Sequence, residues 1–341
     1  MSIPDRLAIS LRELSRYHPV TTASERARGL LLQQRASWDL ARRGYAGLEQ
    51  VEVRTFELDG YPFNVQHNPA RMTSSTASVD EASIRNRRCF LCSEHLPEGQ
   101  KAILLEQEWM LLVNPFPIFP EHFTIANLAH IPQRILGNIC PMLRIVRDLG
   151  PEYTLFYNGP RSGASAPDHM HFQMGSRNFM PIDQEASALI ARHGKELIQG
   201  GPVRLIALAG LLRPFFVLES DDESALEYTI KQLLSLLPES QASPEEPLLN
   251  IIVRWEGFWR VLLYPRTRHR PSFFFQEGPK KILISPAAVD MGGLSIAPRH
   301  EDFSKLSRHD LERMFAEVCL DSRSFTAVVS SLRSRFSGVG K

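Results

Sequence analysis

The spacing of apolar residues predicts helices in the first fifty residues of the chain. Leu7, Leu11 and Leu14 lie three or four positions apart, which places them on one helical face. A second helix is predicted to begin at a Ser24 cap and to run to Tyr45. From residue 51 the period of the pattern changes from that of a helix to that of a strand.

The rest of the chain alternates predicted strands and predicted helices. A hairpin is expected over 51–67, with its turn at Asp59-Gly60. Further strands are predicted at 102–113, 122–128, 153–157, 215–218, 249–253, 259–264 and 281–284, and helices at 132–149, 183–198, 303–318 and 322–335. Another helix should follow a capping box at Ser220-Asp-Asp-Glu223, and residues 238–247 have a loop composition. This order favours an α+β fold over a parallel doubly wound sheet. The strand-then-helix order is loosely similar in the two halves of the chain, which suggests the hypothesis of an internal duplication.

Composition narrows the classes of protein. The chain has 341 residues, of which 43% are hydrophobic and 23% charged, as in soluble globular proteins. A net charge of +1 argues against a broad nucleic-acid surface but leaves room for a nucleotide. A signal-peptide layout, a membrane-length apolar run and a cysteine framework are all missing from the sequence. A cytoplasmic protein with neither a nucleic-acid nor a membrane partner is expected.

The most informative segment of the sequence is 168–174. In a strand, side chains two positions apart share a face, so His169, His171 and Gln173 would point one way. The three apolar residues at 170, 172 and 174 would then point into a core. Two imidazoles and a carboxamide on one face indicate a binding or catalytic surface, whereas incidental histidines on a strand are the alternative.

A loop of small residues precedes this segment. Its backbone N–H groups can form an anion-binding nest, its hydroxyls can donate hydrogen bonds, and its arginine supplies a positive charge. This composition predicts phosphate binding, and a merely flexible loop is the alternative. The candidate substrate-binding residues are Asn158, Gly159, Arg161, Ser162, Gly163, Ala164 and Ser165.

Cys89 and Cys92 form a Cys-x-x-Cys pair, which suggests zinc or redox chemistry. Redox pairs usually begin a helix in a thioredoxin-like context, and the predicted elements around this pair do not provide one. A zinc site would need two further nitrogen or sulfur ligands.

The run from Asn158 to Gln173 resembles the signature of the transferase branch of the histidine-triad superfamily. This branch includes galactose-1-phosphate uridylyltransferases, diadenosine tetraphosphate phosphorylases and GDP-hexose phosphorylases. The Ser-Gly-Ala-Ser loop and segment 114–124 resemble the diadenosine tetraphosphate phosphorylases, 131–135 resembles the GDP-hexose enzymes, and 259–266 and 285–293 resemble the C-terminal part of the phosphorylases. The resemblance implies histidine-triad-like antiparallel sheets with flanking helices. Residues 1–200 would form a half with the helical extension and both motifs, and 201–341 a second half.

The resemblance also implies roles for individual residues. His171 would be the nucleophile that forms a nucleotidyl-histidine. Because one ring nitrogen must present a lone pair, the N–H on the other nitrogen needs an acceptor, which is expected to be a backbone carbonyl. Gln173 would donate to a phosphate oxygen, and glutamine at this position is typical of transferases rather than hydrolases. Arg71 is a candidate phosphate ligand beside an Asn-Pro segment, and Arg266 is a weaker one.

A structural zinc ion is implied in the same way. The bacterial uridylyltransferases complete such a site with two histidines, which correspond to His130 and His169 beside Cys89 and Cys92. His95 and His122 are rival ligands. Cys140 and Cys319 are isolated and are expected to be small buried residues.

Several alternatives stay open within this interpretation. The loop slightly favours an adenylyl donor, a dinucleoside polyphosphate, whereas the zinc signature favours an NDP-hexose. Phosphate or a sugar phosphate would be the acceptor, hydrolysis would need water at the intermediate, and a homodimer is compatible with the resemblance. A non-catalytic zinc-stabilised nucleotide-binding protein is the alternative from another class. Asp168 departs from relatives and could repel phosphates or hold an imidazole or a basic side chain.

Overall fold

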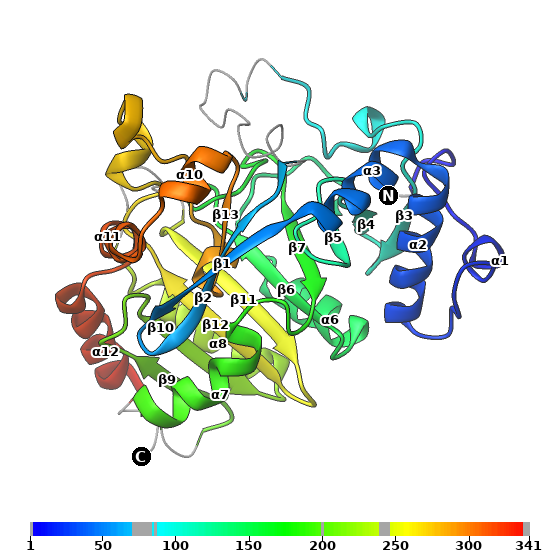
Figure 1. The fold of residues 1–341 in the computed structure, drawn as a ribbon. Coiled ribbons are helices and arrows are strands. Elements are labelled where there is room, and N and C mark those ends of the chain that lie inside the picture. The colour runs from blue at the N-terminus through cyan, green and yellow to red at the C-terminus, as the bar shows by residue number, and fades with distance from the viewer. Residues whose placement is uncertain (1–2, 70–83, 85–86, 199–200, 239–245, 337–341) are drawn as a thin grey trace.

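The computed structural model describes residues 3–69, 84, 87–198, 201–238 and 246–336 (Figure 1). Its helices are α1 (Leu11–Leu14), α2 (Ala23–Ser37), α3 (Asp39–Ala46), α6 (Ile139–Leu149), α7 (Ile182–His193), α8 (Glu223–Leu234), α9 (Ala288–Met291), α10 (His300–Lys305), α11 (Arg308–Val318) and α12 (Ser322–Phe336). A small sheet contains β1 (Glu52–Leu58), β2 (Tyr61–His67) and β13 (Leu294–Ala297). The large sheet contains β3 (Ala102–Leu105), β4 (Trp109–Val113), β5 (His122–Asn127), β6 (Tyr153–Asn158), β7 (His171–Ser176), β8 (Gly194–Glu196), β9 (Arg204–Leu208), β10 (Phe215–Ser220), β11 (Leu249–Trp255) and β12 (Trp259–Pro265).

The large sheet has the order β3-β4-β5-β7-β6-β11-β12-β10-β9-β8, and its neighbouring strands are antiparallel. The predicted α+β fold is confirmed. From its two edges inward, the sheet repeats one strand order, since β3-β4-β5-β7-β6 corresponds to β8-β9-β10-β12-β11. Along the chain, each set also has a helix after its third strand: α6 follows β5, and α8 follows β10. The two sets meet where β6 pairs with β11, and the division at residue 200 stays a prediction.

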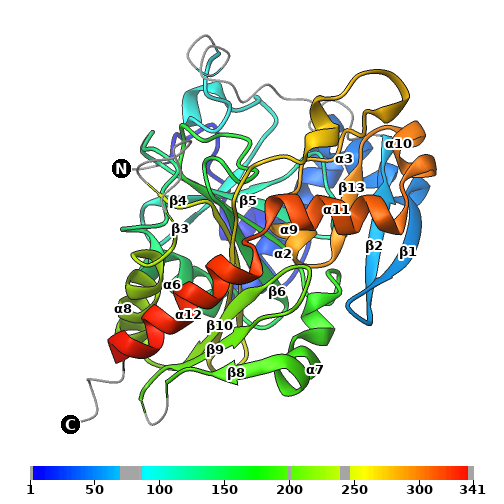
Figure 2. The ribbon, with the colours of Figure 1, turned by 90° about the vertical axis from the view of Figure 1, so that its left-hand side faces the viewer.

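Two hydrophobic cores lie on opposite faces of the large sheet. The strands and the helices around them can be followed in Figure 2. On one face, Leu143 of α6, Leu226 of α8 and Phe325 of α12 pack against the strands. On the other face, Phe63 of the small sheet and Phe315 of α11 belong to the second core. The sheet is therefore a middle layer, buried on both sides over most of its length. None of the described helices has the length and apolar character needed to cross a membrane.

The predicted helix bounds need correction near the N-terminus. The cap of α2 is Thr22 rather than Ser24, because Thr22 forms a capping box with Glu25. The helix expected to reach Tyr45 is interrupted at Trp38, whose φ and ψ of −119° and 108° are extended, so α2 and α3 are separate. The helix expected around the first leucines is the single turn of α1.

Other predicted elements change type or length. The helix expected from 132 begins only at Ile139, because Gly137 has a φ of +87°. The helix expected over 183–198 ends at His193, and 194–196 form the edge strand β8. The cap of α8 is Asp222, while Ser220 Oγ donates to Pro202 O (2.7 Å). Residues 281–284 form no strand; the strand near them is β13, which pairs in parallel with β2.

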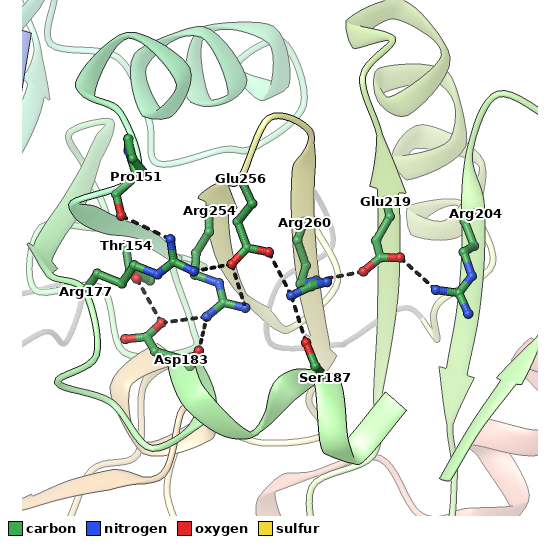
Figure 3. Close-up of polar contacts among 10 residues, drawn as sticks. All are labelled: Pro151, Thr154, Arg177, Asp183, Ser187, Arg204, Glu219, Arg254, Glu256 and Arg260. Atoms are coloured by element: carbon green, nitrogen blue, oxygen red, sulfur yellow. Dashed lines mark hydrogen bonds and ion pairs between the residues drawn. The ribbon is translucent and has the colours of Figure 1, made fainter. Parts of the chain in front are cut away.

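A row of ion pairs ties α7 to the large sheet (Figure 3). The guanidinium of Arg254 on β11 donates to the backbone O (2.5 Å) and Oδ1 (3.4 Å) of Asp183 on α7, and both side chains are almost completely buried. Glu256 contacts the guanidinium groups of Arg254 and Arg260 (3.7 and 2.8 Å). Since a buried carboxylate needs a partner, this row fixes where α7 lies beneath the strands.

Replacement of Arg254 by Met should lower the free energy of unfolding by about 3 kcal/mol near neutral pH, because the carboxylate of Asp183 is left buried without a counter-charge. Burial raises the pKa of Asp183, an effect that the Arg254 charge opposes. A raised folded pKa means tighter proton binding in the folded state, so the loss should shrink as the pH is lowered. Urea unfolding at about pH 8 and about pH 5 measures both values. Equal losses at the two pH values would contradict this explanation; Arg204→Met, at an exposed ion pair, is the control.

Candidate active site

His171 is the first residue of β7 and is 2% exposed. Its Nδ1 lies 2.8 Å from His169 O, and a carbonyl can only accept, so Nδ1 carries the proton and Nε2 presents a lone pair. Burial lowers the pKa of His171 to about 4, while the hydrogen bond to His169 works in the opposite direction. The imidazole is therefore neutral near pH 7, which is the form that a nitrogen nucleophile needs.

Gln173 lies on the same face of β7 as His171, while Phe172 and Met174 belong to the core on the opposite face. Its Oε1 is 3.0 Å from Nε2 of His122 on β5. The other ring nitrogen of His122 accepts the backbone N–H of Ile118 (3.2 Å), so Nε2 must be the donor. This hydrogen bond fixes the carboxamide of Gln173 with its oxygen toward His122. The NH₂ group is left as the donor for another acceptor.

His122 was a rival zinc ligand by sequence, but the structure gives its ring these two other partners. Its contact with Gln173 follows from the pairing of β5 with β7, where Thr124 lies opposite Gln173. Sequence reasoning missed this role, because the register of two distant strands leaves no mark in local periodicity.

The loop after β6 is held against the second strand set. Asn158 Oδ1 accepts hydrogen bonds from Asn250 Nδ2 (2.9 Å) and the Ala288 N–H (2.8 Å), so this oxygen has a scaffolding role. Gly163 has a φ of +104°, and a Cβ there would lie 2.5 Å from that of Ala287, so the position requires glycine. The hydroxyl of Ser162 is buried and has no hydrogen-bond partner within the described chain. An unpartnered buried hydroxyl in a glycine-containing loop fits a site for a polar ligand.

The remaining predicted phosphate ligands differ in their surroundings. The backbone N–H of Gly159 donates to Leu249 O (3.2 Å). Arg161 is exposed, Ala164 is buried and Ser165 is half-buried in the same loop. The guanidinium of Arg266 is buried and saturated by Asn250 Oδ1 and by backbone carbonyls, so it stabilises the loop rather than offering a free donor. Arg71 lies outside the described residues.

Cys89, Cys92, His130 and His169 converge on one point, with their candidate ligand atoms within 4.8 Å of one another. The sulfur-to-nitrogen distances are 3.3 Å for Cys89–His169, 3.1 Å for Cys92–His130 and 3.6 Å for Cys92–His169, all measured to Nδ1. A tetrahedral zinc ion would hold such atoms about 3.6 Å apart. His169 Nε2 lies 2.8 Å from Asn127 O and so carries the proton, which leaves Nδ1 free to bind metal. The four side chains therefore fit zinc.

Asp168 is directed toward this cluster. Its carboxylate accepts a hydrogen bond from Arg87 (2.7 Å) and lies 3.9 Å from His130 Nε2. The structure therefore favours the second alternative for Asp168, in which the carboxylate holds a basic side chain and an imidazole. His169 precedes β7 rather than lying in it, and its backbone carbonyl accepts the hydrogen bond from Nδ1 of the His171 ring. One residue thus belongs to the cluster through its ring and orients His171 through its backbone.

Comparisons with known proteins concern the fold in which these residues lie. Residues 30–176 match a domain of unknown function, DUF4922, and residues 196–337 match the GDPGP1-like C-terminal domain. The crystal structure of the yeast Ap4A phosphorylase Apa2 is similar, with a TM-score of 0.53 and 16% identity over 82% of this chain and 93% of that chain. Apa2 in complex with Ap4A gives a TM-score of 0.51 and 17% identity over 82% and 96% of the two chains. None of the curated proteins matches the sequence significantly.

These findings define the class of fold. The chain shares the α+β fold of the yeast Ap4A phosphorylase Apa2, in agreement with the fold that its histidine motif predicts. Its C-terminal part matches a GDPGP1-like domain.

Proposed function

We propose that this protein is a nucleotidyltransferase of the phosphorylase type, in which His171 carries the nucleotidyl group. The observation that carries the proposal is the hydrogen bond from Nδ1 of His171 to His169 O, which leaves the lone pair of a neutral imidazole on Nε2. The oriented amide of Gln173 and the unpartnered hydroxyl of Ser162 support it. The fold shared with Apa2 supports the same reaction class.

The reaction would proceed in two in-line displacements. In the first, Nε2 of His171 attacks the α-phosphorus, the N–P bond forms, and the P–O bond to the leaving phosphate breaks. In the second, an oxygen of the acceptor phosphate attacks the same phosphorus and the N–P bond breaks, which restores the neutral imidazole. The carbonyl of His169 stabilises the positive charge on the ring between the two steps, and the Gln173 amide donates to a non-bridging oxygen.

The donor we favour is a dinucleoside polyphosphate with an adenylyl group, which the likeness to a phosphorylase crystallised with Ap4A supports. An NDP-hexose is the second candidate, because the convergent Cys₂His₂ cluster and the GDPGP1-like match favour it. The test is incubation with radiolabelled Ap4A, UDP-glucose and GDP-glucose, each with and without phosphate. A phosphoramidate is acid-labile and alkali-stable, so labelled protein with those properties supports the intermediate. Failure of all three donors to label the protein contradicts it.

The cluster of Cys89, Cys92, His130 and His169 would hold a structural zinc ion in this proposal. Such an ion supplies folding energy and fixes the segment that leads into β7. It would take no part in the displacement itself.

The change Gln173→Glu should reduce kcat/KM by about 100-fold, because a carboxylate cannot donate to the phosphate oxygens and repels them. Its oxygen can still accept from His122, so folding should be preserved. Steady-state kinetics with the donor that labels the wild type measure the effect, and Gln184→Glu on the exposed side of α7 is the matched control. Retention of wild-type kcat/KM would exclude the assigned role of Gln173.

A further inference from the structure

Gln133 is a buried glutamine in the segment between β5 and α6, and its side chain reaches the beginning of β7. Both ends of its segment are anchored. Ile131 O accepts the Met170 N–H (2.7 Å), and the Ile135 N–H donates to the Glu246 carboxylate (2.6 Å). The Gln133 N–H donates to Pro167 O (3.2 Å). The side chain is therefore held from the backbone outward, with 1% of the residue exposed.

The carboxamide of Gln133 replaces direct backbone hydrogen bonds between β6 and β7 at one end of their pairing. The β6–β7 ladder runs as far as Phe156 opposite Gln173. Continued by two residues, this register would place Asn158 opposite His171. Instead the amide stands between the two strands, because Nε2 donates to Asn158 O (2.9 Å) and to His171 O (3.0 Å) while Oε1 accepts the His171 N–H (2.7 Å).

These three hydrogen bonds allow only one orientation of the amide. Both hydrogens of Nε2 have acceptors, and Oε1 has a donor, so a flipped amide would place N–H against N–H and oxygen against carbonyl. The amide thus acts as an additional peptide group that spreads β6 and β7 at one end. The candidate phosphate loop begins at Asn158, and His171 is the proposed nucleophile. The two strands are therefore separated at the point from which both the loop and the nucleophile start.

We infer that Gln133 is a positioning residue, which fixes the backbone of His171 and with it the direction of the imidazole lone pair. The inference rests on the proposed function of His171. Since Nδ1 is bonded to His169 O, the ring has little freedom of its own, and a shift of the His171 backbone moves Nε2 directly. A misplacement of about 1 Å in a reacting group can cost about 100-fold in rate.

The first test compares Gln133→Met with Gln100→Met. Gln100 is also buried and donates to Val113 O (3.2 Å) in another part of the fold, so it controls for the loss of any buried amide. With the radiolabelled donor that labels the wild type, the maximal rate of nucleotidyl-histidine formation should fall by about 100-fold in Gln133→Met. The donor concentration at half-maximal rate should change by less than about threefold, and Gln100→Met should label at nearly the wild-type rate.

The second test needs no substrate. Hydrogen exchange of the His171 amide, measured by NMR in the native state, should accelerate by about tenfold or more in Gln133→Met and in the shorter Gln133→Asn. The amide of Leu263 on distant β12 should keep its protection in both. Gln133→Asn keeps a polar amide at the site if the methionine variant does not fold.

The possible outcomes distinguish a failure of the positioning role of Gln133 from a failure of the proposed function of His171. Wild-type labelling by either Gln133 variant, an equal loss in Gln100→Met, or unchanged exchange of the His171 amide would overturn the role of Gln133. If none of the three donors labels the wild type, the proposed function fails, while the exchange measurement still decides whether Gln133 holds the His171 backbone.

Discussion

The variant His171→Ala is expected to lose covalent labelling by the nucleotide donor and to lose at least about 10⁴-fold in turnover, because no other group replaces an absent nucleophile. His171 is buried and neutral, with Nε2 as the only nitrogen free to attack. Quench-flow labelling with radiolabelled Ap4A, UDP-glucose and GDP-glucose measures the first step directly. His193→Ala, at the end of α7, is the control for loss of an imidazole. Acid-labile label on His171→Ala would show that another residue is the nucleophile.

The second large effect is expected from Cys89→Ser, which removes one thiolate from the Cys₂His₂ cluster. The bound zinc should fall from about one ion per chain to near zero, because a structural site needs all four ligands. The midpoint of thermal unfolding should fall by about 10 °C, since the loss of a structural metal is among the costliest single changes. Metal analysis by mass spectrometry and calorimetry measure the two quantities.

Cys140→Ser is the matched control, because Cys140 is half-buried on α6 and outside the cluster. A chelator should lower the midpoint of the wild type to that of Cys89→Ser and leave the midpoint of the variant unchanged. Purified wild-type protein that binds no zinc when zinc is supplied would exclude the site.

The features that the sequence predicted well are local. The hairpin of β1 and β2 follows from alternation on both sides of Asp59-Gly60, and Asp59 has a φ of 56° as such a turn requires. The apolar positions around His171 predicted which face of β7 enters a core. That Cys89, Cys92, His130 and His169 lie together was predicted through their order in a family motif, which records distant contacts that periodicity does not contain.

The features that the sequence did not predict depend on contacts between distant segments. The strand β13 has four residues, and its partner β2 lies more than 200 positions earlier, so nothing local distinguishes it from 281–284. The contact of His122 with Gln173 requires the β5–β7 register, and the insertion of Gln133 requires the end of the β6–β7 ladder. Tertiary hydrogen bonds, rather than propensity, determine these features.

The repeated strand order of the large sheet has a consequence for stoichiometry. β7 begins with His171 after residues 159–170, whereas its counterpart β12 begins with Trp259 after the short turn 256–258. Trp259 is a core residue whose indole N–H donates to Leu143 O (2.8 Å), and so short a turn leaves no room for an anion-binding loop. Under the proposed function, only the strand set that contains β7 carries the nucleophile, while the set that contains β11 holds Asn158 in place through Asn250. Each chain should therefore accept at most one nucleotidyl group. In the labelling experiment, the amount of label bound in the first turnover should reach at most one equivalent per chain, although each chain has two strand sets.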